Sequence, residues 1–439
     1  MKEITQLRKF LVIIALVIAT IISLPKISNA AIDTVAETAI IVDVNTGKIL
    51  YAKSENEPLP PASMTKMMTE YIVFDQIDKN ELSWDKKTEI SDYVFDISAN
   101  NNFSGIGLRK NIDYTVKDLY EAMAINSDNA TTIALAELIS ETEGEFVKLM
   151  NETGEKMGLP DFQFVNSTGL DNDSNGVIAP EGTSPDDSNL LSAKSAALLA
   201  YHIVTDYPEA LEISKIPEKK FEDQMIRNYN WMLPHETSHL DQFFYEGVDG
   251  LKTGNTSLAG YTFTGTAEKD GRRLITVVMK AESEAVRFKE TAKLLDYGFN
   301  EFKEVELFPK GYQLEDESIL DVAKGKQETV EFALEESISS LIKNNTEENY
   351  QIEYEIDDDL LNEDGEIVAP IEKGTVIGKA NLINDGDNNY GYIVEGEEKT
   401  TVNLVTTEEI EKKNWFSAML DSIGGFFKNL FNGIVGIFK

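Results

Sequence analysis

None of the 439 residues is a cysteine, and this absence restricts what the chain can fold into more than any other feature. It excludes disulfides, thiol nucleophiles and thiolate metal sites. The histidines are three in number, which leaves little room for an imidazole zinc site. We therefore expect no metal and no cofactor. A chain of this length predicts two or three domains held by apolar burial, with chemistry carried by hydroxyl, amine, amide or carboxylate groups.

The first 30 residues have the pattern of a secretory signal peptide. Basic residues precede an apolar run over 10–24, and the small residues Ser28 and Ala30 follow it. The run is shorter than the roughly 20 residues that span a bilayer. We expect residues 1–30 to be removed during export, which would place the mature protein on the outer face of the cytoplasmic membrane. An uncleaved N-terminal anchor is the alternative.

The charge balance is strongly acidic, with 40 basic and 77 acidic residues and a net charge of −37. Such a chain repels phosphate backbones, so we expect no nucleic-acid partner. Residues 304–410 alone hold 28 acidic and 7 basic residues. They also contain short β-branched runs at 329–334, 350–356 and 400–405, which predict a small all-β domain.

Residues 31–303 mix hairpin and helix signals and predict one larger domain. Hairpins are expected over 38–53 and 260–280 because alternating apolar runs flank turn residues. Residues 171–189 are rich in Asp, Ser, Asn, Gly and Pro and predict a long surface loop. The expected helices run from Ser63 to Asp78, from a capping box at Thr115 and Asp118 to just before Asn126, from Ala130 to Ile139, and from Ala285 to Tyr297.

The last segment, 411–439, has an apolar stripe. Large apolar residues recur at spacings of three and four between Trp415 and Phe438. Asp421 and Lys428 interrupt the run, and a charge at the bilayer centre costs at least about 2.5 kcal/mol. We therefore expect an amphipathic helix that lies on a membrane surface and anchors the protein. A helix packed on the protein itself is the alternative.

Ser63 and Lys66 place a hydroxyl and an amine three residues apart at the start of a predicted helix, where both lie on one face. A serine hydroxyl becomes a good nucleophile only when a nearby base removes its proton, and a desolvated lysine can be that base. The same spacing begins at Ser23, Ser83 and Ser340. Alone, the pattern is therefore more typical of solvated surface.

Two further motifs follow in the chain. Ser127, Asp128 and Asn129 lie in the break between two predicted helices and offer a hydroxyl and a carboxamide, although helix capping would also explain the three residues. Lys252, Thr253 and Gly254 precede a strand-like run. The lysine and threonine can hold a carboxylate, and the glycine would let a substrate backbone approach the strand edge. The alternative there is an exposed turn.

Together and in this order, the three motifs resemble those of the low-molecular-weight penicillin-binding proteins, which are serine D-alanyl-D-alanine carboxypeptidases. Residues 164–170, 248–254 and 259–261 add to this resemblance. It implies an α+β fold: a β-lactamase-like transpeptidase domain, with an antiparallel sheet flanked by helices, followed by a small all-β domain and a C-terminal amphipathic helix. It also implies peptidoglycan stem peptides as substrate and β-lactam antibiotics as inhibitors.

The resemblance further assigns roles to residues. Ser63 would be the nucleophile, Lys66 its general base, and Ser127 with Asn129 the proton relay and substrate amide contact. Lys252 and Thr253 would bind the terminal carboxylate beside Gly254, and the N–H groups of Ser63 and Asn255 would form the oxyanion hole. No metal is required by this chemistry.

Two other functions remain open from the sequence. A class A β-lactamase needs a glutamate-activated water, and no Glu-x-x-Leu-Asn stretch lies between Asn129 and Lys252. A catalytically silent penicillin-sensing or wall-binding module would keep the fold without turnover. Carboxypeptidase, endopeptidase and transpeptidase activities share the acyl-enzyme, so the sequence does not separate them.

Overall fold

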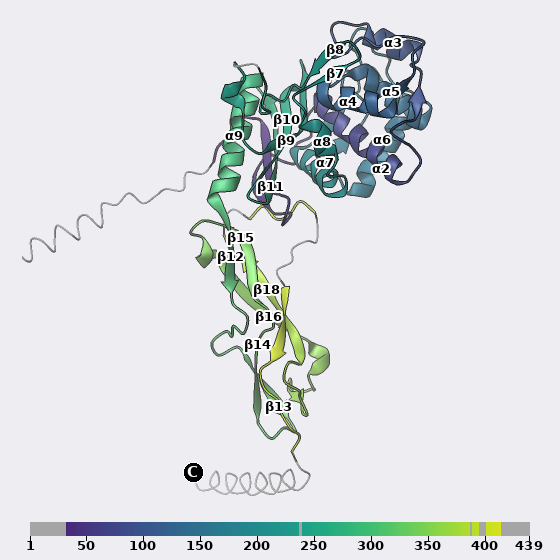
Figure 1. Ribbon diagram of the computed structural model, residues 1–439. Helices are drawn as coiled ribbons and strands as arrows, with labels where there is room; N and C mark the ends of the chain where they lie inside the picture. The colour runs from purple at the N-terminus through teal and green to yellow at the C-terminus, as the bar shows by residue number, and fades with distance from the viewer. Residues whose placement is uncertain (1–31, 237–238, 387–388, 395–400, 414–439) are drawn as a thin grey trace, which may run out of the picture. The chain divides into compact units, whose positions relative to one another are not determined.

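The computed structural model describes residues 32–236, 239–386, 389–394 and 401–413 (Figure 1). Within these residues the first domain mixes helices with an antiparallel sheet, and the second is rich in strands. This confirms the predicted mixed fold followed by a β domain. The amphipathic helix expected over Trp415–Phe438 lies outside the described residues.

The first domain is built on a five-stranded sheet of order β2-β1-β11-β10-β9. Its strands are β1 (Thr38–Asp43), β2 (Ile49–Lys53), β9 (Val248–Thr256), β10 (Gly260–Lys269) and β11 (Arg272–Ala281). All neighbouring strands are antiparallel; Ile40 lies opposite Val277, and Thr264 opposite Lys252. Both predicted hairpins are confirmed. Asp270 and Gly271 have positive φ at the tip of the second, as a tight hairpin turn requires.

Helices cover both faces of this sheet. α9 (Glu284–Glu301) packs on β10 and β11 along one face, and α7 (Ala193–Asp206) packs on β1 and β11 along the other (Figure 1). This two-sided cover explains why every residue of β1 is buried. The other α-helices described before β9 are α2 (Lys66–Asp78), α3 (Asp92–Ser98), α4 (Val116–Asn126), α5 (Asn129–Ser140), α6 (Glu143–Met157) and α8 (Ala210–Ser214).

Shorter elements complete the first domain. Residues 171–189 carry only turns and bends, as predicted. The short strands form three two-stranded pairs: β3 (Lys87–Thr88) with β4 (Tyr114–Thr115), β5 (Phe162–Gln163) with β6 (Leu190–Leu191), and β7 (Glu218–Phe221) with β8 (Gln224–Arg227). The 3-10 turns are η1 (Ala62–Thr65) and η2 (Asp241–Phe243).

The helix expected from Ser63 begins three residues later. Residues 62–65 form the 3-10 turn η1, and α2 starts at Lys66. The amide of Met64 donates to the Pro61 carbonyl oxygen, an i to i−3 bond that tightens this turn. Ser63 therefore lies just before the helix and Lys66 in its first turn.

The second domain holds a six-stranded sheet of order β16-β18-β19-β14-β13-β17 and a separate β12-β15 pair. Its core contains Val330, Phe332, Ile377 and Leu404. The strand run predicted at 350–356 and the observed strand β16 cover the same residues. The strands are β12 (Phe302–Phe308), β13 (Ile319–Ala323), β14 (Thr329–Leu334), β15 (Ile338–Lys343), β16 (Tyr350–Ile356), β17 (Ile367–Val368), β18 (Val376–Asn384) and β19 (Thr401–Thr406).

The last described residues, 411–413, are extended. Their backbone exchanges hydrogen bonds with residues 324–326 of the same domain. The helix predicted over 411–439 can therefore begin only after Lys413. Within the part of the chain that the structure describes, no helix combines the length and apolar character needed to cross a membrane.

Candidate active site

Ser63 and Lys66 meet as the sequence predicted. The Lys66 ammonium Nζ lies 3.0 Å from Ser63 Oγ, because the 3-10 turn and the first turn of α2 bring positions i and i+3 to one face. Ser63 is half-buried, whereas Lys66 is fully buried. The hydroxyl can thus be reached by a substrate while the amine is shielded from water.

Lys66 makes two more hydrogen bonds in its buried position. Nζ donates to Asn129 Oδ1 at 2.8 Å and to the Thr168 carbonyl oxygen at 2.6 Å. Burial lowers the pKa of Lys66 well below that of a free lysine, and the positive charge of Lys252 lowers it further. A neutral amine held against Ser63 Oγ can take the serine proton.

Ser127 follows α4 as its C-cap and Asn129 begins α5, so the predicted break between two helices is confirmed. Ser127 adopts a left-handed conformation with φ of 58°. Asp128 caps α5, accepting from the Thr131 amide at 2.7 Å, and its second oxygen accepts from the Ile106 amide at 2.6 Å. The capping interpretation is thus correct for the aspartate, while the residues on either side face the two lysines.

Lys252 joins this group from β9. Its Nζ donates to Ser127 Oγ at 2.8 Å and to the Thr253 carbonyl at 3.3 Å. Burial lowers the pKa of Lys252 to about 8; the Glu70 carboxylate opposes this shift and the Arg287 guanidinium adds to it. Lys252 and Thr253 are buried in the strand, whereas Asn255 is exposed at its end.

Gly254 is needed for a reason that the sequence did not indicate. A Cβ at this position would lie 2.5 Å from the Pro61 carbonyl oxygen and 2.4 Å from Thr262 Oγ1. The backbone that lies so close to Gly254 is therefore the chain's own segment before Ser63. Glycine lets β9 run directly alongside the turn that carries Ser63.

The turn over 166–169 forms another wall of the site. Asn166 Oδ1 accepts hydrogen bonds from the amides of Thr168 and Gly169, which fixes the carbonyl that faces Lys66. Gly169 has φ of +83°, and a Cβ there would lie 1.9 Å from the Ala62 carbonyl oxygen. Only the family resemblance pointed to this stretch, because a backbone carbonyl leaves no signal in side-chain identity.

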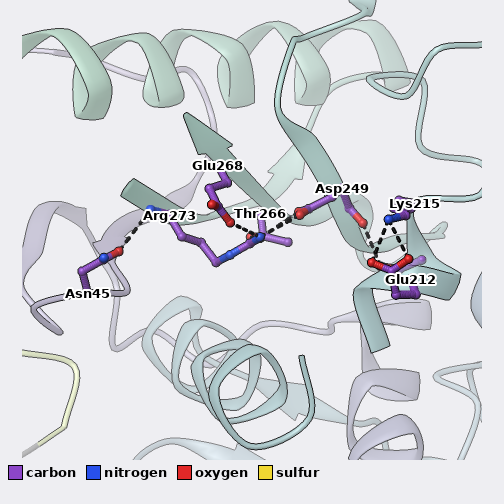
Figure 2. Close-up of polar contacts among 8 residues, drawn as sticks. Asn45, Glu212, Lys215, Asp249, Thr266, Glu268 and Arg273 are labelled. Atoms are coloured by element: carbon purple, nitrogen blue, oxygen red, sulfur yellow. Dashed lines mark hydrogen bonds and ion pairs between the residues drawn. The ribbon is translucent and has the colours of Figure 1, made fainter. Parts of the chain in front are cut away.

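The start of β9 is held by an ion pair with β11 (Figure 2). Arg273 on β11 reaches across β10, and its Nη1 and Nη2 donate to the two carboxylate oxygens of Asp249 at 2.9 Å each. The same guanidinium bonds Thr266 and Glu268. A bidentate pair of this kind is geometrically specific, so it holds β9 in one register.

The buried charged residues beside the motifs that sequence patterns did not reveal include Glu70 and Arg287. Glu70 lies on α2 one turn beyond Lys66 and is 1 % exposed. Arg287 on α9 is 2 % exposed, and its Nη1 donates to the Gly254 carbonyl oxygen at 3.0 Å. Its guanidinium thereby supports the strand and adds positive charge near Lys252. The sequence feature that could have revealed Arg287 as buried is its place next to Phe288 on a helix that faces the core.

Two family models match this chain. Residues 25–283 match the family model of D-alanyl-D-alanine carboxypeptidases, and residues 302–412 match that of the penicillin-binding protein 5 C-terminal domain. The D-alanyl-D-alanine carboxypeptidase DacF of Bacillus subtilis is 32% identical over 354 residues, which cover 80% of this chain and 82% of that protein.

Solved structures give the same result. PBP3 of Streptococcus pneumoniae, described as a peptidoglycan synthesis regulatory factor, is 32% identical, with a TM-score of 0.65 over 86% of this chain and all of that one. Penicillin-binding protein D2 of Listeria monocytogenes, solved with ampicillin bound, is 29% identical, with a TM-score of 0.52 over 62% of this chain and all of that one. The chain therefore belongs to the D-alanyl-D-alanine carboxypeptidase family of serine hydrolases, the low-molecular-weight penicillin-binding proteins.

Proposed function

We propose that this serine D-alanyl-D-alanine carboxypeptidase removes the terminal D-alanine of peptidoglycan stem pentapeptides through an acyl-enzyme on Ser63. Lys66 accepts the hydroxyl proton as Ser63 Oγ attacks the carbonyl carbon of the penultimate D-alanine. The amide C–N bond then breaks, and the departing amine takes up a proton, relayed through Ser127. Water hydrolyses the ester, restoring the Ser63 hydroxyl and freeing the tetrapeptide.

Recognition of the substrate falls to the other predicted residues. Lys252 and Thr253 bind the terminal carboxylate, and Asn129 contacts the substrate amide. The N–H groups of Ser63 and Asn255 stabilise the oxyanion, where one donor is worth about 3 to 4 kcal/mol in the transition state. The observation that carries the proposal is the contact of Lys66 Nζ with Ser63 Oγ, together with that of Lys252 Nζ with Ser127 Oγ.

Ser63→Ala will abolish D-alanine release from a pentapeptide ending in D-Ala-D-Ala, because among the described residues Ser63 is the hydroxyl that Lys66 contacts. Free D-alanine is measured by a coupled oxidase assay. Ser83→Ala is the matched control, since Ser83 begins another Ser-x-x-Lys match in exposed surroundings. Release that persists in Ser63→Ala, or is lost in Ser83→Ala, would overturn the assignment.

β-Lactam antibiotics are proposed as inhibitors that acylate the same serine. The Listeria relative was solved with ampicillin and with cefotaxime bound. Labelled penicillin should attach to Ser63, as peptide mapping by mass spectrometry would reveal.

The final proposal concerns location: residues 1–30 direct export, and the apolar stripe between Trp415 and Phe438 holds the mature protein on the outer face of the cytoplasmic membrane. Each large apolar side chain buried contributes roughly 1.5 to 3 kcal/mol, which outweighs charge repulsion that salt screens within about 8 Å.

Truncation after Lys413 should therefore release a soluble protein that still binds penicillin. This end point keeps the backbone bonds of 411–413 with 324–326. Both forms are compared after removal of residues 1–30, by membrane sedimentation and penicillin labelling. A truncated form that still sediments with membranes would contradict the anchor.

A further inference from the structure

Glu70 is a buried carboxyl group that the proposed mechanism leaves without a role. It lies on α2 four residues after Lys66, on the same face of the helix, and α2 packs against β9, the strand that carries Lys252. At 1 % exposure its side chain is as enclosed as the catalytic lysine. A carboxyl group is buried in this way at a cost unless nearby positive charge compensates it.

The charged groups around Glu70 come from several elements. Lys252 on β9 and Lys66 on α2 both favour its ionised form, and the effect of Lys252 is the larger. Tyr120 on α4 also faces it, and the Glu70 carboxylate helps to raise the pKa of that phenol. Burial raises the pKa of Glu70 itself to about 7, although the two lysines oppose this shift.

Other carboxylates near the site act on one lysine only. Asp128 and Glu143 both favour the charged form of Lys66. The charged groups that act on Lys252 are different: Glu70 favours its positive form, and Arg287 disfavours it. Glu70 is therefore the carboxylate that both lysines share.

The proposed reaction requires the two lysines to differ in charge. Lys66 must be neutral to accept the serine proton, and Lys252 must be positive to hold a substrate carboxylate. Two buried amines close together repel, so without a counter-charge both lose their protons readily. A carboxylate that interacts more strongly with Lys252 than with Lys66 favours the required arrangement.

We propose that Glu70 is a positioning residue of the active site: its buried carboxylate keeps the single positive charge of the lysine pair on Lys252 and so leaves Lys66 as the base. This inference rests on the roles proposed above for the two lysines. It assigns Glu70 no contact with the substrate.

The test is the pH profile of acylation by benzylpenicillin, whose carboxylate stands in for that of the substrate. For the unmutated enzyme the second-order rate constant should fall above about pH 8, as Lys252 loses its proton. The negative charge of Glu70 raises the pKa of Lys252, so its removal must lower that pKa. In Glu70→Gln the alkaline limb of the pH profile should move to lower pH by one unit or more. At a fixed pH on that limb, this shift is a tenfold loss of the rate constant.

Three further variants make the test decisive. Glu70→Met is a second neutral replacement for use if the glutamine variant does not fold, and it should shift the limb equally. Glu70→Asp keeps the charge and should retain most of the limb's position. Glu143→Gln removes a buried carboxylate that acts on Lys66 alone, so its alkaline limb should stay in place.

A second probe separates this inference from the proposed function. Benzylpenicillin methyl ester lacks the carboxylate, so the shift between unmutated enzyme and Glu70→Gln should be absent with it. An unmoved limb in folded neutral variants, or an equal shift with the ester, would overturn the role of Glu70. Labelling that persists in Ser63→Ala would instead overturn the proposed function.

Discussion

Lys66→Ala will reduce acylation of Ser63 by at least about 10³-fold, since a positioned general base typically contributes 10²- to 10⁴-fold and no other amine contacts this hydroxyl within the described residues. The loss should fall on the rate of acylation by labelled penicillin and equally on D-alanine release, because both begin with the same proton transfer. Stopped-flow labelling and the D-alanine assay measure the two.

Lys79→Ala is the control for this result. Lys79 caps the C-terminus of the same helix and pairs with Asp75 in an exposed position, so its loss should leave acylation within a factor of two. Because Lys66→Ala also leaves Asn129 and the Thr168 carbonyl without a donor, thermal melting must accompany the assay. A folded Lys66→Ala enzyme that keeps a tenth of the acylation rate would exclude the lysine as base.

Lys252→Ala will lower kcat/KM for a D-Ala-D-Ala peptide by about 10²-fold, because a hydrogen bond to a charged group contributes about 1.5 to 3 kcal/mol. The loss should be far smaller for the same peptide with an amidated C-terminus, which offers no charge to the missing ammonium group. Steady-state kinetics on the two peptides measure this difference. Equal turnover of free and amidated peptides by the unmutated enzyme would contradict the carboxylate-binding role.

The sequence predicted most elements whose boundaries depend on local chemistry. The capping box at Thr115 and Asp118 is confirmed, with both reciprocal hydrogen bonds present. The strand runs at 329–334 and 350–356 are confirmed, because alternating burial imposes a period of two that is visible in sequence. The helix expected from Ser63 begins instead at Lys66, and the sequence did not reveal this because a 3-10 turn has the same composition as a helix start.

The charge environment of the site could not be predicted. The helix α2 is buried around much of its circumference, so apolar periodicity assigns no face on which Glu70 could be recognised as internal. Its second partner, Lys252, lies on a strand far away in the sequence. Likewise, the pairing of Arg273 with Asp249 depends on the register of β9, β10 and β11 together, which no local pattern encodes.

The strand order has a consequence for the order in which this enzyme folds. In the pairing of β1 with β11, Ile40 meets Val277, more than two hundred residues later, while every helix from α2 to α8 lies in the chain between them. Closing so long a segment delays non-local pairing. A chain that emerges N-terminus first therefore carries β1 with one edge open until nearly the whole first domain has appeared, and α2, which bears Lys66, can contact β9 only at the end.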